Sequence, residues 1–184
     1  AMWVAGSENV RVIGNDVFGS TIGFEITVSN NVWFTQNKVY GNTLGIGLFH
    51  PDGAGNPQKP VMKNWVIEHN DVRDNNREND APGGFQSILP PGIGIMLAGV
   101  SDHVIAKNTV VGNKFVGIGV LGWCTATDGT ENNCDDHPPF LGEDNVFYDP
   151  AANNNLVSQN KVSGNGGSPP GGGTLPIDIL TADL

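Results

Sequence analysis

Polar and hydrophobic residues follow one template that recurs five times along the chain. The template is an Asn, five residues, a second Asn, one residue and a Val, with Asp replacing the first Asn in the fourth copy; its copies span residues 9–17, 31–39, 64–72, 102–110 and 154–162. Gly-rich apolar stretches, such as residues 45–48 and 117–120, lie between the copies. Alternation with a period of two, β-branched residues, and Gly and Asn at regular breaks predict short strands throughout.

The spacing of the copies predicts a solenoid. The first two copies are 22 residues apart. At roughly 3.3 Å per residue this is a contour of about 73 Å, which suits one turn of a three-sided coil. Because each coil returns a strand beside its equivalent in the previous coil, the sheets must be parallel and their connections right-handed. We therefore expect an all-β fold, a right-handed parallel β-helix of about five to six coils, with residues 1–184 in one domain.

The second Asn of the template forms a column through the coils. An Asn side chain tolerates a left-handed corner and can hydrogen-bond to its equivalent one coil further on. This predicts a structural ladder of Asn15, Asn37, Asn70, Asn108 and Asn160. His69 and His103 occupy repeat positions that other residue types hold in neighbouring coils, so both are expected to be structural.

On these repeats the chain resembles the right-handed parallel β-helix repeat family of the pectate-lyase-like superfamily. It is also similar to bacterial β-helix repeat proteins of unassigned function, through Asp-Asn-Asn at 74–76 and Pro-Pro-Gly-Ile-Gly-Ile at 90–95. The resemblance implies the fold and an association with extended polysaccharides. It does not by itself imply catalysis, because one fold serves many functions.

Charge and hydropathy restrict the partners. The chain has 19 acidic and 9 basic residues, a formal net charge of -10. This argues against nucleic acid and anionic membrane surfaces as partners, because both bind basic patches. No run approaches 18 apolar residues, so no membrane span is predicted. The chain opens within a strand and closes in an unfinished sixth coil, so we expect missing coils or another chain to cap its ends.

Three insertions interrupt the repeat. The ladder Asn residues are successively 22, 33, 38 and 52 residues apart, and the excess lies at 50–63, 76–91 and 122–153. All three segments flank the sheet formed by the Gly-rich stretches, so they are predicted to wall a groove along it. The outward residues of this sheet, which form the groove floor, are expected to be Glu25, Gly47, Gly94 or Met96, Gly119 and Asp178.

The groove floor lacks the carboxylates that calcium-dependent lyases and two-carboxylate glycosidases need. Its glycines either leave a flat strip for an extended chain or mark tight packing. Candidate catalytic residues therefore come from the loops: His50 with Asp52 suits a general base, and Arg77 or Lys59 could neutralise a uronate. The alternative for residues 50–53 is ordinary turn chemistry.

The third insertion contains both cysteines and seven acidic residues without Lys or Arg. A Cys124–Cys134 disulfide would contribute about 2–3 kcal/mol through loop entropy and would favour an exported location. The alternative is two buried thiols. The acidic residues are either a solvated loop or a Ca²⁺ site, for which the candidates are Asp128, Glu131, Asp135 and Asp136.

Trp123 precedes Cys124 and permits two interpretations. An exposed indole beside the glycine floor would stack on a sugar ring, while Arg77 binds a carboxylate or sulfate. Alternatively, Trp123 packs over its own loop as a small satellite core.

We therefore expect an extracellular, periplasmic or cell-surface scaffold. It would bind an extended polysaccharide along the groove through Trp123, Arg77, Lys59 and Glu25, without catalysis. The alternative is a polysaccharide-modifying enzyme, a uronate lyase or C5 epimerase, with catalytic residues in the loops.

Overall fold

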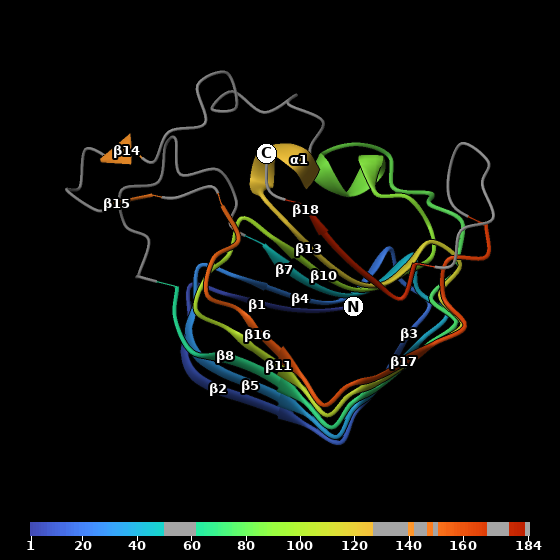
Figure 1. Ribbon diagram of the computed structural model, residues 1–184, viewed down its shortest axis with the longest axis horizontal. Helices are drawn as coiled ribbons and strands as arrows, with labels where there is room; N and C mark the ends of the chain where they lie inside the picture. The colour runs from blue at the N-terminus through green and yellow to red at the C-terminus, as the bar shows by residue number, and fades with distance from the viewer. Residues whose placement is uncertain (50–61, 127–139, 142–146, 149–150, 169–176, 183–184) are drawn as a thin grey trace.

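The chain winds into a three-sided coil whose sides are three parallel sheets (Figure 1). The computed structural model describes residues 1–49, 62–126, 140–141, 147–148, 151–168 and 177–182. Sheet A contains, in spatial order, β1 (Met2–Ala5), β4 (Ile22–Thr27), β7 (Leu44–Phe49), β10 (Ile93–Ala98), β13 (Val116–Leu121) and β18 (Ile179–Ala182). Sheet B contains β2 (Glu8–Ile13), β5 (Asn30–Thr35), β8 (Trp65–Glu68), β11 (Val104–Ala106) and β16 (Leu156–Ser158). Sheet C contains β3 (Asp16–Phe18), β6 (Lys38–Tyr40), β9 (Asp71–Arg73), β12 (Thr109–Val111) and β17 (Lys161–Ser163).

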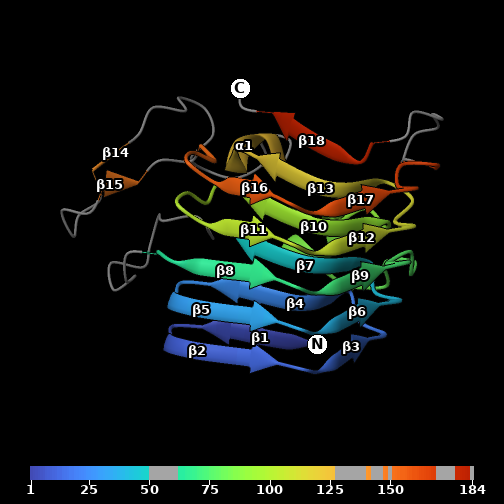
Figure 2. The ribbon, with the colours of Figure 1, turned by 60° about the horizontal axis from the view of Figure 1, so that its bottom comes forward.

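Successive coils stack in the register that the template predicts (Figure 2). The Val that closes each copy pairs with its equivalent in the next coil; this column is Val17, Val39, Val72, Val110 and Val162. The prediction of a parallel β-helix with five to six coils is confirmed.

The other elements are a short antiparallel pair, β14 (Phe140–Leu141) with β15 (Phe147–Tyr148), the 3-10 helix η1 (Phe85–Ile88) and the helix α1 (Trp123–Ala126).

One hydrophobic core fills the interior of the coil. Alternate strand residues face inward, so Phe24 and Ile26 of β4 and Ile95 and Leu97 of β10 are fully buried. Phe24 of sheet A stacks on Phe34 of sheet B with ring centroids 3.7 Å apart. The core therefore ties the sheets together across the coil as well as along it.

Residues with positive φ turn the corners, but the ladder Asn is not among them. Between sheets B and C the left-handed residue is the one immediately before the ladder Asn: Gly14, Gln36, His69, Lys107 and Gln159, with φ of 55–72°. The prediction that the ladder Asn itself adopts the left-handed conformation is wrong. One left-handed residue suffices to turn the chain, and the next residue is then free to direct its amide into the coil.

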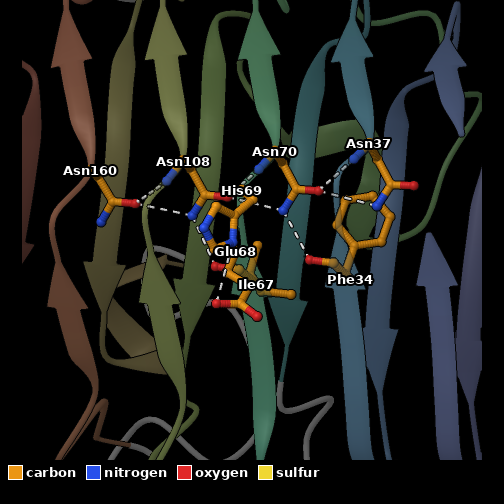
Figure 3. Close-up of polar contacts among 8 residues, drawn as sticks. All are labelled: Phe34, Asn37, Ile67, Glu68, His69, Asn70, Asn108 and Asn160. Carbon is orange, nitrogen blue, oxygen red and sulfur yellow. Dashed lines mark hydrogen bonds and ion pairs between the residues drawn. The ribbon is translucent and has the colours of Figure 1, made fainter. Parts of the chain in front are cut away.

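The predicted Asn ladder is confirmed (Figure 3). Each Nδ2 from Asn15 to Asn108 donates to the Oδ1 of the equivalent Asn in the next coil at 3.0–3.1 Å. The backbone N–H of the same residue donates to that Oδ1 as well, for example from Asn70 to Asn108 at 3.0 Å. The second Nδ2 hydrogen of Asn70 goes to the Phe34 carbonyl at 2.9 Å. The buried amide therefore uses both its donors and its acceptor, as buried polar groups must.

A second ladder runs parallel to the first at the corner between sheets C and A. Its Asn residues follow the template Val by three positions in each coil, and the sequence analysis did not predict a ladder there. It links Asn42, Asn75, Asn113 and Asn165 by the same side-chain and backbone hydrogen bonds. It ends on Asp178, whose Oδ1 accepts from Asn165 Nδ2 at 2.9 Å. Asp178 was predicted on the groove floor; instead, its carboxylate accepts the last donors of this ladder.

Candidate functional site: the outer face of sheet A

The outward residues of sheet A form one row across the strands. Glu25 pairs with Gly47, Gly47 with Met96, and Met96 with Gly119. These four residues thus lie where the sequence predicted the groove floor. Of the two alternatives Gly94 and Met96, only Met96 faces outward. A side chain on Gly94 would point inward, 2.7 Å from Val110 Cγ1 and 2.9 Å from Asn113 Nδ2.

Most of this outer face is covered by a second hydrophobic cluster. The cluster, called here the outer cluster, consists of Ile22, Leu44, Phe49, Leu89, Ile93, Met96, Ala98, Val116 and Trp123, with Phe85 packed against it. Figure 1 shows η1 and α1 lying on the outer side of sheet A. The described parts of the second and third insertions, 76–91 and 122–126, therefore fold down onto the sheet.

Aromatic contacts join the sheet to both insertions. The Phe85 ring meets the Phe49 ring edge-on at 4.9 Å and stacks on Trp123 at 5.2 Å. Trp123 is only 7% exposed. The expectation of an exposed Trp123 platform is therefore wrong. The indole is buried, as the satellite-core interpretation required, but the described neighbours of its ring are Phe85 of the second insertion and Phe49 of sheet A. The ring is buried because it shares apolar neighbours with η1 and with the face of sheet A.

The glycine at the middle of the row makes room for this packing. A Cβ on Gly47 would collide with the ring of Phe49, two residues further along the same strand. Phe49 therefore lies back over Gly47, and a larger residue there would displace it. Of the two interpretations of the glycine floor, the structure supports tight packing at this position.

Arg77 is held at the edge of the second insertion. Its backbone N–H donates to the Asn42 carbonyl at 3.0 Å, and its guanidinium donates to the Asp80 carboxylate, with Nη1 to Oδ1 at 2.7 Å. This hydrogen-bonded pair raises the pKa of Arg77 and lowers the pKa of Asp80. The guanidinium that was predicted to meet a carboxylate or sulfate on a ligand is thus paired with a carboxylate of its own segment.

The uncovered part of the face lies over β1 and β4. Trp3 is 67% exposed, and its Nε1 donates to Thr27 Oγ1 at 3.0 Å. Its pairing partner in the sheet is Glu25, which is half-buried between Trp3 and Gly47. Burial raises the pKa of the Glu25 carboxyl. No described residue gives Glu25 a hydrogen bond or an ion pair.

Trp3 is the residue that the sequence analysis missed. The signal was present, because residues 2–9 match residues 24–31 at the 22-residue spacing, which places Trp3 beside Glu25 on the same face. What the repeat could not show is that η1 and α1 leave this strip open while covering the strands beyond it.

The two predicted structural histidines have different surroundings. His103 is 1% exposed inside the coil and stacks on Trp65 at 4.3 Å, and its Nδ1 accepts from the Trp65 backbone N–H at 3.4 Å. Burial lowers the pKa of His103 to about 3. His69 lies exposed at a corner, with its Nδ1 3.5 Å from Glu68 Oε2.

Several predicted site residues lie outside the described residues. They are His50, Asp52 and Lys59 of the first insertion, and Asp128, Glu131, Cys134, Asp135, Asp136 and the side chain of Cys124 in the third. The catalytic, calcium and disulfide predictions therefore stay predictions. In the part of the chain that the structure describes, no three His, Cys, Asp or Glu residues are grouped to hold a metal ion. None of the helices described is long and apolar enough to cross a membrane.

Comparison with known proteins agrees with this architecture. A family model described as a right-handed β-helix region matches residues 1–134, which is most of the chain. No curated protein and no solved structure matches the sequence.

Proposed function

Because this chain belongs to the right-handed β-helix family, we propose that it is an exported, non-catalytic scaffold that binds an extended polysaccharide on the outer face of sheet A. The observation that carries the proposal is the open strip beside the outer cluster, in which exposed Trp3 lies next to half-buried Glu25 and is held by the buried Thr27 hydroxyl. The exported location is supported by the cysteine pair of the sequence and by the kind of ligand proposed.

The strip has the chemistry of a sugar-binding surface. An exposed indole stacks on the apolar C–H face of a pyranose ring, and neighbouring polar groups fix the ring's orientation. The hydrogen bond from Trp3 Nε1 to Thr27 already holds the indole in one position. Less side-chain entropy is therefore lost when a ligand binds. Glu25, adjacent to Trp3, offers an acceptor for donors on the sugar.

The same strip does not supply the groups that catalysis needs. Glycoside hydrolysis requires two carboxyl groups, about 5–9.5 Å apart. Among the described residues on the outer face of sheet A, Glu25 is the only one with a titratable side chain. A single carboxyl group beside an aromatic ring suits binding better than bond cleavage.

The test is binding of a panel of polysaccharides, with product formation followed in the same samples. We expect Trp3→Ala to weaken binding by about tenfold or more, the loss of at least about 1.4 kcal/mol. Phe18→Ala is the matched control, because Phe18 is 59% exposed on sheet C, away from the strip. Lack of binding by any polysaccharide would refute the binding role. New unsaturated uronates or reducing ends would show instead that the protein is an enzyme.

A further inference from the structure

Resting on the proposed function above, we propose that the bound polysaccharide carries ammonium groups, as a polymer of amino sugars does, and is not a polyuronate. Three features of the described residues support this ligand class: an uncompensated carboxyl group, a face without cations, and an indole whose neighbour is an acid.

The first feature is the isolation of Glu25. Its neighbours across the sheet are Trp3 and Gly47, and neither provides a charge. No described residue donates a hydrogen bond to its carboxyl group. A half-buried carboxylate without a donor has lost part of its hydration and gained nothing in return. A ligand ammonium placed beside it would restore both a hydrogen bond and a favourable charge interaction.

The second feature is the distribution of basic residues. The described Lys and Arg residues lie on sheets B and C, at corners or in connections: Arg11, Lys38, Lys63, Arg73, Arg77, Lys107, Lys114 and Lys161. Arg77, on the insertion that covers sheet A, is paired with Asp80. A polyuronate on the open strip would meet the Glu25 carboxylate, and no described Lys or Arg side chain lies on that face. Like charges at short range disfavour binding.

The third feature comes from comparing two tryptophans within the protein. Trp33 on sheet B pairs with Arg11, whose guanidinium carbon lies 5.5 Å from the centre of the indole ring. Trp3 on sheet A pairs with Glu25 instead. Arg11 lies one coil before Trp33, and Glu25 lies one coil after Trp3. The charged neighbour of Trp33 in its sheet is thus a cation, and the charged neighbour of Trp3 is an acid. An ammonium group from a ligand would contact both the indole face and the carboxylate.

The experiment compares three soluble oligosaccharides of equal length by calorimetry: a glucosamine oligomer, its fully N-acetylated counterpart and an oligouronate. We expect the glucosamine oligomer to bind at least about tenfold more tightly than the acetylated one. Glu25→Gln should remove this advantage, so that the affinities of this variant for the two oligomers differ by no more than about twofold. Glu68→Gln, which removes an outward acid of sheet B, is the control for general attraction to a chain of net charge -10.

The outcomes separate this inference from the function beneath it. Binding of the oligouronate as tight as that of the glucosamine oligomer would overturn the inference while keeping the scaffold role. Equal loss in Glu25→Gln and Glu68→Gln would also overturn it, because the attraction would then be non-specific. Failure of all three oligosaccharides to bind would overturn the proposed function itself.

Discussion

Two hydrophobic clusters lie on the two faces of sheet A, and they arise in different ways. The inner cluster fills the coil and takes its residues from repeat positions, so Phe24, Ile46, Ile95 and Ile118 follow one another across neighbouring strands. The outer cluster joins strand residues to Phe85, Leu89 and Trp123, which belong to insertions. The inner cluster is what makes the chain a solenoid. The outer cluster decides which part of the sheet stays open to a ligand.

The largest difference between the two clusters should appear when the same side chain is removed from each. Phe24→Ala deletes a fully buried ring that bridges two sheets, and we expect it to cost about 3–5 kcal/mol of unfolding free energy. Phe85→Ala should cost only about 1–2 kcal/mol, because η1 can detach from the sheet without opening the coil. Chemical denaturation measures both values. Equal costs would show that the outer cluster is part of the cooperative core.

Acid should destabilise the interior through His103. Burial lowers the pKa of this histidine to about 3, whereas an unfolded histidine titrates near 6.5. The unfolded state therefore binds the extra proton first, so stability is complete above about pH 6.5 and falls as the pH decreases toward about 3. At pH 4 the loss is about 3 kcal/mol.

The matched variants for this effect are His103→Asn and His69→Asn. Asn at 103 can still accept from the Trp65 N–H, and Asn155 occupies the same repeat position one coil later. Between pH 7 and pH 4 the unfolding free energy of His103→Asn should fall by less than that of the wild type, because the variant has no histidine to protonate at this position. His69→Asn, at an exposed corner, should keep it. A wild-type slope in both variants would contradict the buried, neutral histidine.

Removal of one rung should break the Asn ladder at the edge of the inner cluster. Asn37→Ala deletes the acceptor used by Asn15 and the donors that reach Asn70, Val12 and Thr35. Each net hydrogen bond contributes about 0.5–1.5 kcal/mol, and buried groups left without partners add to the loss. We expect a total cost of about 1–3 kcal/mol in thermal or chemical unfolding. An unchanged melting temperature would contradict a contribution from the ladder.

The smallest effect is expected at the open strip. The raised pKa of Glu25 means that the folded state holds this proton more tightly than the unfolded state. Protonated Glu25 therefore contributes to the free energy of unfolding at acid pH, and this contribution is lost as the pH rises through the folded-state pKa. Glu25→Gln should therefore gain stability relative to the wild type from acid to neutral pH. A constant difference across that range would place a compensating cation beside Glu25.

The repeat itself was readable from the sequence, because each coil places the same residue type in the same surroundings. The Val column and the Asn15-to-Asn160 ladder were predicted from spacing alone and are confirmed. The second ladder was missed although Asn42, Asn75, Asn113 and Asn165 also recur. Its residues follow corner positions, where Asn has good local reasons to occur without a partner in the next coil.

By itself, the sequence determined the strands, their parallel order and the inward side chains, since these depend on interactions that repeat at each coil. Tertiary structure decided the site. Phe49, Phe85 and Trp123 share no period, so nothing in their spacing indicates that they meet. Their contact follows from two insertions burying apolar surface against the nearest available face. That packing buries Trp123, leaves Trp3 exposed and isolates Glu25 beside it, because it covers only part of sheet A.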